Sequence, residues 1–256
     1  MDHRFVWYDL LTTDLNAAKA FYGDIVGFEQ VPSGMPGQRY DLLQAGGQPI
    51  GGALQLTDAM CDGGARPGWI GYIAVEDIDA ALSRLGSLGG KTLMGKTEIP
   101  AVGWFAMAAD PQGAPFQLLQ SLPEREDRAD PPAGTAGKVG WRELAAADWE
   151  KAWDFYQAMF GWKLNEAYDM GPMGKYQLWR AYGENADGGM FTKPAEMPHP
   201  AWAFYFIVHG AKAAAGRIEA AGGQVLMGPM EVPGGDWVIN ALDPQGGAFA
   251  LLSGTP

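Results

Sequence analysis

Hydrophobic and polar residues follow a pattern that predicts one strand, one helix and then three more strands. Phe5 to Thr12 is a run of β-branched, aromatic and leucine residues with a single acid, Asp9, which is typical of a buried strand. Asp14 can cap a helix, and apolar residues from Asn16 to Ile25 fall on one helical face. Three short strands are then predicted around residues 28–31, 39–44 and 50–56.

The same order begins again at Gly68. A strand over 68–74 is followed by Asp77 as a cap, a helix over 78–88 and a stop at Gly89-Gly90. Strands are predicted near residues 91–93, 104–108 and 115–119, and further helices near 149–159 and 211–221. The chain therefore consists of four β-α-β-β-β modules.

Repeated residues show that the two halves of the chain are a tandem duplication. Asp110-Pro-Gln-Gly113, a turn signal before an apolar strand, returns as Asp243-Pro-Gln-Gly246. Phe21-Tyr22 on the first helix returns as Phe155-Tyr156. Such self-similarity indicates repeated units of structure.

The repeat predicts an α+β protein with two domains. We expect the first domain over 1–120, with modules 1–66 and 67–120, and the second over 138–256, with modules 138–198 and 199–256. Residues 121–137 hold several prolines and a run of charges without periodicity, which is typical of an exposed linker.

Composition restricts the class of partner. The formal net charge of −12 disfavours binding to nucleic acid or to anionic membranes, and 47% hydrophobic residues suffice for a core in each half. A lone cysteine, Cys61, excludes an intrachain disulfide and a cysteine metal cluster. With neither a signal peptide nor an apolar run of membrane-spanning length, the expected location is the cytoplasm, as a monomer or homodimer.

Four such modules, with an acid before the first helix, the Phe-Tyr pair and the Asp-Pro-x-Gly turn, resemble the vicinal-oxygen-chelate superfamily. This superfamily includes glyoxalase I, bleomycin-resistance proteins and extradiol dioxygenases, and the two-domain glyoxalase-like branch is the most similar. The resemblance covers nearly the whole chain. It implies that paired modules curl their sheets into cups that hold a divalent metal.

The resemblance also locates the metal ligands of the family, and this chain departs from them. First-strand positions fall on Trp7, Ile70, Trp141 and Ala203, none of which binds a metal. Last-strand positions fall on two residues, Gln117 and Ala250. One neutral amide does not hold a divalent ion against water. We therefore expect no metal and no other cofactor.

Alternation along the first strand of each half gives the candidate catalytic residues. Trp7 and Asp9 share one strand face, as do Trp141 and Glu143, and the family geometry points these faces into the cups. A carboxylate in an apolar cup is a candidate general acid or base. The alternative is structural, in which the acid pairs with an arginine or caps a backbone group.

Trp7 and Trp141, with five other residues at corresponding positions of the halves, are candidates for binding a small molecule. The five others are aromatic except for one amide: Tyr72, Trp104, Gln117, Tyr205 and Trp237. Each aromatic residue also has a structural interpretation, as a buried ring that fills space. Because Gln117 stands where the second half has Ala250, we expect the first cup to be the more polar one. The pairs Gly46-Gly47 and Gly51-Gly52 fit no nucleotide-binding motif, which leaves a role in turns and bulges.

Two functional hypotheses follow. The first is a metal-independent enzyme of glyoxalase-like ancestry, a lyase, isomerase or hydroxylase-like protein, in which Asp9 or Glu143 moves a proton. The second is a non-catalytic protein that sequesters an aromatic or drug-like compound, as bleomycin-resistance proteins do. A metalloenzyme would require further ligands from strand ends in the first and third modules.

Overall fold

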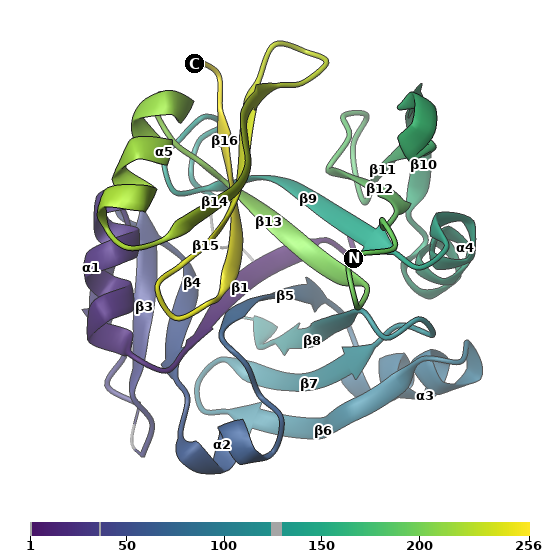
Figure 1. Cartoon of the computed structure of the whole chain (residues 1–256). Helices are drawn as coiled ribbons and strands as arrows, with labels where there is room; N and C mark the ends of the chain where they lie inside the picture. Colours follow the sequence, from purple (N-terminus) through teal and green to yellow (C-terminus); the bar gives the residue numbers. More distant parts are fainter. Residues whose placement is uncertain (1, 36, 124–129) are drawn as a thin grey trace. The chain divides into compact units, whose positions relative to one another are not determined.

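The computed structural model describes residues 2–35, 37–123 and 130–256, so part of the predicted linker, 124–129, lies outside the described residues. The first half contains the modules in the predicted order (Figure 1). Its elements are β1 (Phe5–Thr12), α1 (Leu15–Ile25), β2 (Glu29–Pro32), β3 (Tyr40–Ala45), β4 (Gln48–Gln55), α2 (Asp58–Asp62), β5 (Gly68–Ala74), α3 (Ile78–Ser87), β6 (Lys91–Ile99), β7 (Gly103–Ala109) and β8 (Pro115–Ser121).

The second half repeats this plan, except that a short 3-10 helix lies between its second and third strands and residues 193–200 form no helix equivalent to α2. Its elements are β9 (Val139–Ala146), α4 (Trp149–Phe160), β10 (Lys163–Asp169), η2 (Gly171–Met173), β11 (Lys175–Arg180), β12 (Gly188–Thr192), β13 (Ala201–Ile207), α5 (Ala211–Ala220), β14 (Gln224–Glu231), β15 (Trp237–Leu242) and β16 (Ala248–Ser253).

The strands form two eight-stranded mixed sheets, which confirms the α+β class. Hydrogen-bonded neighbours run β2-β3-β4-β1-β5-β8-β7-β6 in the first sheet and β10-β11-β12-β9-β13-β16-β15-β14 in the second. Within each module the first strand pairs in parallel with the last, as β1 does with β4, and the remaining pairs are antiparallel. The first strand of each module therefore lies inside the sheet, where its side chains are best fixed.

Acid caps begin three of the four long helices. Asp14 accepts hydrogen bonds from the backbone N–H groups of Asn16 and Ala17, and Asp77 does the same for Asp79 and Ala80, as predicted. Asp148 caps α4 in the same manner. Each cap satisfies backbone donors that the first helical turn leaves without an intrahelical partner.

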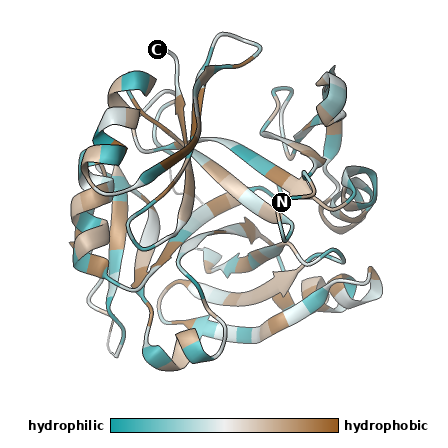
Figure 2. Ribbon diagram, viewed as in Figure 1, coloured by the Kyte–Doolittle hydropathy of each residue, from teal (hydrophilic) through white to brown (hydrophobic). Residues whose placement is uncertain are grey.

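Three local expectations need correction. Gly51-Gly52 is not in a turn but lies inside β4, where the pairing with β3 is irregular next to Gly51. Asp58–Asp62, for which the sequence predicts no helix, form helix α2, which includes Cys61 and is capped by Thr57. Strand β6 extends to Ile99 rather than ending near 93, and Lys91 to Glu98 are all exposed, with brown and teal residues mixed along the strand in Figure 2.

Backbone proximity groups the described residues into two compact units. One unit contains residues 2–6, 71–123 and 142–202, and the other contains residues 7–35, 37–70, 130–141 and 203–256. Each unit therefore combines a module from the first half of the sequence with one from the second. In the second of these units, α1 and α5 lie side by side (Figure 1).

A buried tyrosine joins the two modules of each unit. The hydroxyl of Tyr22 on α1 donates to Asp243 Oδ2 at 2.9 Å, and Trp69 Nε1 donates to the Tyr22 oxygen at 3.1 Å. The other Asp243 oxygen accepts the backbone N–H groups of Gln245 and Gly247. The repeated Asp-Pro-Gln-Gly turn is thus both closed on itself and tied to a helix of another module.

The equivalent contact recurs in the other unit. Tyr156 donates to Asp110 Oδ2 at 3.3 Å and accepts from Trp202 Nε1 at 3.0 Å. Burial raises the pKa of Asp110 and of Asp243, while the hydrogen bonds that they accept lower it in part. Burial also raises the pKa of Tyr22 and of Tyr156 well above the usual tyrosine value, and the adjacent aspartate raises it further.

Within the described ranges we find no helix with the length and apolarity needed to cross a membrane.

Candidate functional site

A cluster of three polar groups lies on one face of the first module. Trp7 Nε1 is 2.9 Å from both Asp9 Oδ1 and the Tyr40 hydroxyl, and that hydroxyl donates to Asp9 Oδ1 at 2.8 Å. Asp9 is only 5% exposed, whereas Trp7 and Tyr40 are half-buried. The structure therefore brings together the predicted Trp7 and Asp9, and adds a tyrosine from β3.

The third module has a carboxylate and tyrosine in the same relation. Tyr176 on β11 donates to Glu143 Oε2 at 2.7 Å. The Tyr176 ring stacks on Phe191 of β12, with centroids 6.0 Å apart. A tyrosine and an acid are thus paired in the first module of each half.

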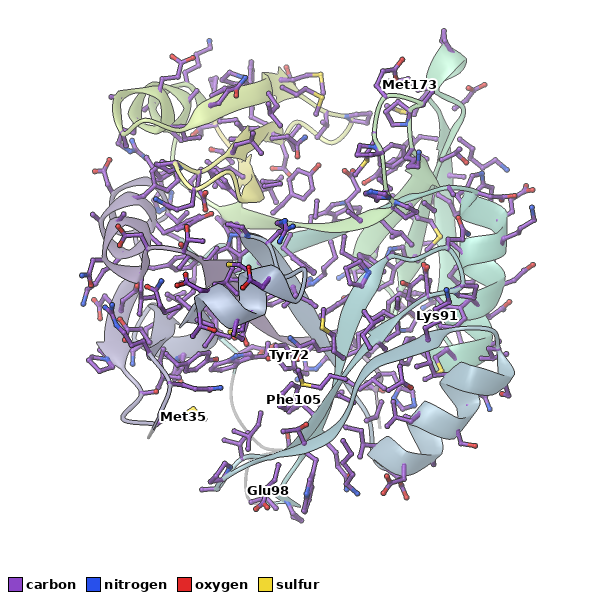
Figure 3. All side chains as sticks on the ribbon, turned by 60° about the horizontal axis from the view of Figure 1, so that its bottom comes forward. Met35, Tyr72, Lys91, Glu98, Phe105 and Met173 are labelled. Carbon is purple, nitrogen blue, oxygen red and sulfur yellow. The ribbon has the colours of Figure 1, made fainter. Side chains whose placement is uncertain are left out.

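In the second module an amide lies next to aromatic rings. Gln117 on β8 pairs in register with Tyr72 on β5 and with Met107 on β7, so these three residues share one face. The rings of Tyr72 and Phe105 have centroids 6.3 Å apart, and Figure 3 shows the two side chains next to each other. Gln117 is 7% exposed, and its Oε1 accepts no hydrogen bond from the described residues.

The matching face of the fourth module is apolar at its centre. Tyr205, Val238 and Ala250 form a buried cluster, against which the predicted Trp141 packs. Leu252 also contacts this cluster. The structure therefore brings the predicted Trp141 and Tyr205 together.

The strand register changes the expected difference in polarity between the halves. Gln117 faces Met107 across β8 and β7, while Ala250 faces Asn240 across β16 and β15. Each sheet therefore carries one amide at this depth. It lies on the last strand, β8, in the first sheet and on the strand before the last, β15, in the second. The first half is more polar at position 117, and the second is more polar at Asn240.

Two predicted binding residues lie elsewhere. Trp104 pairs with Gln120, so it points to the sheet face opposite that of Gln117, and Lys96 Nζ lies 5.4 Å from its ring centre. Trp237 likewise points to the sheet face opposite that of Val238, and Lys212 Nζ of helix α5 lies 5.3 Å from its ring centre. The structure does not bring these two tryptophans to the faces that carry the other candidates.

A separate small cavity contains none of the predicted residues. It has a volume of about 250 Å³ and is lined by Leu164, Asn165, Arg180 and Glu184. Arg180 is engaged by the carbonyl of Gly183, and Asn165 donates to the carbonyl of Glu184. These side chains therefore close the loop between β11 and β12.

Comparison with known proteins identifies the family. The sequence profile described as "Glyoxalase/Bleomycin resistance protein/Dioxygenase superfamily" matches residues 4–118 and 138–251. The chain belongs to this superfamily. The two matched ranges coincide with the two halves of the tandem repeat, and the resemblance predicted from the sequence is confirmed.

Two relatives match this chain over more than nine-tenths of their own length. "Putative glyoxylase CFP32" of Mycobacterium bovis is 30% identical over 252 residues, which cover 98% of this chain and 94% of the relative. "Anthracycline biosynthesis protein DauV" of Streptomyces sp. (strain C5) is 28% identical over 260 residues, covering 96% and 91%.

Solved structures confirm the superfamily fold. The Mn(II)-bound glyoxalase from Novosphingobium aromaticivorans matches with a TM-score of 0.68 at 16% identity, covering 99% of this chain and 83% of that chain. The 2,3-dioxygenase LapB from Pseudomonas sp. KL28 matches with a TM-score of 0.67 at 14% identity, covering 99% and 92%.

The residues at the superfamily's metal positions do not fit a divalent ion. In the register of the sheets, Tyr72 lies beside Gln117 and Tyr205 lies beside Ala250, so the last strands offer one amide and one methyl group. Trp141 of the third module and Ala203 of the fourth pack against the apolar cluster of Tyr205, Val238 and Ala250. Over residues 2–35, 37–123 and 130–256, no three His, Cys, Asp or Glu side chains converge as a metal site would need.

We predict that the purified protein retains no stoichiometric divalent metal, because neutral amide and apolar groups stand where the superfamily has its ligands. Elemental analysis after extensive dialysis measures this directly. About one Zn, Ni, Fe or Mn ion per chain, retained at that stage, would contradict the prediction.

Sequence reasoning missed Tyr40, Tyr176 and Asn240. Tyr40 begins β3 and Tyr176 is the second residue of β11, and a Gly-Gly pair follows each of them, at Gly51-Gly52 and Gly188-Gly189; this shared order is the signal that could have found them. Asn240 could have been found only from the strand register, since the pairing of β15 with β16 decides that it faces Ala250.

Proposed function

We propose that this superfamily protein binds a small aromatic molecule on the sheet faces that carry Gln117 and the two carboxylate and tyrosine pairs. The observation that carries this proposal is the Gln117 side chain. Its Oε1 is buried and accepts no hydrogen bond from the described residues. The same sheet face carries Tyr72, Phe105 and Met107. A buried acceptor without a partner requires a donor from water or from a ligand.

The neighbours of Gln117 favour an aromatic ligand. Tyr72 and Phe105 offer ring edges and faces, and Met107 offers a flexible, polarizable side chain that adapts to a planar molecule. Met94, which pairs with Met107, is 46% exposed and extends this apolar surface toward solvent. The relatives described as anthracycline biosynthesis proteins support the same class, since anthracyclines are fused aromatic ring systems.

The two halves should prefer different ligands. An amide at Gln117 in the first half and at Asn240 in the second places the polar contact on different strands. A ligand with one hydroxyl group is therefore bound in different orientations by the two faces. If the protein converts the bound molecule chemically, we propose that Asp9 and Glu143 carry a proton in that reaction. Product analysis separates such an enzyme from a sequestering protein.

The test is calorimetric titration with 1,5-dihydroxynaphthalene. Replacing Gln117 with alanine should weaken binding at the first face by roughly 10-fold, because a lost hydrogen bond to a buried group costs about 1–3 kcal/mol. The reverse change, Ala250→Gln, should strengthen or reorient binding at the second face. Gln38→Ala, at an exposed amide, is the matched control and should have no effect.

Absence of saturable binding by the wild-type protein, to this or to other fused aromatic compounds, would overturn the proposed function. Equal affinities of wild type, Gln117→Ala and Ala250→Gln would show instead that the ligand binds elsewhere.

A further inference from the structure

The two carboxylate and tyrosine pairs share a construction that the individual contacts do not explain. Tyr40 lies on β3 and Asp9 on β1, and these strands are separated by β4. Likewise Tyr176 on β11 and Glu143 on β9 are separated by β12. Each tyrosine must therefore extend across an intervening strand to reach its acid.

Glycine in the intervening strand makes this path possible. Gly52 pairs with Asp9 in register, and a Cβ atom there would lie 1.9 Å from the Tyr40 hydroxyl. Gly189 pairs with Glu143, and a Cβ atom there would lie 2.4 Å from the Tyr176 hydroxyl. Both distances are far below any van der Waals contact, so each phenol occupies the space that a side chain would take.

Neither glycine is needed for its backbone angles, since neither has a positive φ. Gly95 in β6 provides the contrast, because a Cβ atom there would meet nothing within 4 Å. The repeated Gly-Gly pair thus fixes the position of a phenol on the sheet. Glycine inside a strand otherwise weakens it, so its use in both halves favours a specific role for the phenol.

The hydrogen bond to the acid makes the phenol oxygen a stronger hydrogen-bond acceptor. A hydroxyl that donates to a carboxylate is polarised, and its oxygen becomes a stronger acceptor for another donor. Tyr40 is half-buried, whereas Asp9 is only 5% exposed, so the tyrosine is the more exposed residue of the first pair. Trp7 Nε1, 2.9 Å from the phenol oxygen, shows that this oxygen can accept an N–H donor.

We propose that Tyr40 and Tyr176 are ligand-contacting residues, which accept a hydrogen bond from an O–H or N–H group of the aromatic ligand. Asp9 and Glu143 are then positioning residues that act through the tyrosines, and Gly52 and Gly189 determine specificity by leaving room for them. This assignment rests on the proposed function and names the chemical group that the ligand must carry.

Two probes of the same ring size test the assignment, 1-naphthol with a donor and 1-methoxynaphthalene without one. Calorimetry on the wild-type protein should show a preference for 1-naphthol of about 10-fold or more, as expected where a site is built to bind a hydroxyl group. Combined with Gln117→Ala, which removes the other proposed acceptor, the variant Tyr40→Phe with Tyr176→Phe should bind both probes with affinities within about 3-fold of each other, since a hydrogen bond to a charge-assisted group has been removed.

Matched variants separate this role from a purely structural one. Tyr168→Phe removes another tyrosine hydroxyl near an acid, since Tyr168 is 3.4 Å from Glu166 on an exposed edge, and it should keep the wild-type preference. Gly52→Ala with Gly189→Ala should lose the preference, whereas Gly95→Ala should keep it. Asp9→Asn with Glu143→Gln retains the phenols, and it should reduce the preference without abolishing it.

The hydrogen bonds between Trp7, Asp9 and Tyr40 can also be followed without a ligand, which keeps the test usable when a variant loses stability. The Trp7 indole N–H resonance in ¹H–¹⁵N spectra should shift in Tyr40→Phe and in Asp9→Asn, and should not shift in Tyr168→Phe. Binding of neither probe to the wild-type protein overturns the proposed function. Binding of both probes with no preference, or a preference that survives in the variant combining Tyr40→Phe, Tyr176→Phe and Gln117→Ala, overturns the tyrosine assignment alone.

Discussion

Replacing Tyr156 with phenylalanine is expected to lower the free energy of unfolding by about 2–4 kcal/mol at neutral pH, because each buried polar group left unpaired costs about 1–3 kcal/mol. The change removes the donor to Asp110 Oδ2 and the acceptor of Trp202 Nε1 together. Tyr22→Phe removes the equivalent contacts of Asp243 and Trp69 and should have a similar effect. Urea unfolding followed by circular dichroism measures both losses.

The loss should increase with pH. Burial raises the pKa of Asp110 above its unfolded value of about 3.9. Its contribution to stability is therefore complete below the unfolded pKa and decreases as pH rises through the folded pKa. The Tyr156 hydrogen bond lowers the folded pKa, so its removal extends this decrease to higher pH. The destabilisation by Tyr156→Phe should thus be larger at pH 8 than at pH 5.

The exposed Tyr168 again provides the control, and Tyr168→Phe should change the free energy of unfolding by less than about 0.5 kcal/mol, as for most surface substitutions. A loss below about 1 kcal/mol in both Tyr22→Phe and Tyr156→Phe, with no pH dependence, would mean that the tyrosines do not hold the turns to the helices.

Truncating Trp179 to alanine is expected to lower the free energy of unfolding by about 3–5 kcal/mol, the range for large aromatic residues in a core. Trp179 is 1% exposed and stacks on Trp162 with ring centroids 4.1 Å apart and planes 7° apart. Phe5 and Trp202 surround the pair. Gly188 makes room for the indole, since a Cβ atom there would lie 2.6 Å from the Trp179 ring.

Phenylalanine at position 179 tests the cause of this loss. Trp179 Nε1 is buried and has no hydrogen-bond partner among the described residues, so its removal costs no hydrogen bond. Trp179→Phe should therefore cost less than half as much as Trp179→Ala, and both are measured by urea unfolding. Equal losses in the two variants would show that the indole N–H, rather than ring packing, stabilises this core.

The two glycines of β12 relate this core to the proposed binding face. Gly188 accommodates Trp179 on one side of the strand, while Gly189 accommodates Tyr176 on the other. Successive side chains of a strand point to opposite faces, so one Gly-Gly pair serves both. Stability and the position of the phenol thus depend on adjacent residues of one strand.

Much of the fold was predictable because it rests on local chemistry that the sequence states directly. A run of apolar residues with one acid predicted β1, the acids Asp14 and Asp77 marked helix starts, and Asp110 with Asp243 marked repeated turns. Helix α2 was not predicted because its five residues have no buried face, and only the cap at Thr57 marks it. The full length of β6 was missed because its exposed residues carry no alternating pattern.

The candidate site was predictable only in part. Alternation correctly placed Trp7 with Asp9 on one strand face, since parity is a local property of a strand. Parity also decides against Trp104, but that requires its register with Gln120 on another strand. The tyrosines could not be assigned to their acids, because Tyr40 and Asp9 meet across an intervening strand.

The sequence by itself determined the tandem repeat, the module order, the superfamily and the absence of metal-binding residues at the superfamily's ligand positions. These follow from residue identity and short-range periodicity. Only the tertiary structure decided that Tyr22 bonds to Asp243, that Gly52 makes room for Tyr40, and that Asn240 faces Ala250. The physical reason is that register and packing join residues distant in the chain, and side-chain hydrogen bonds depend on positions within a few tenths of an ångström.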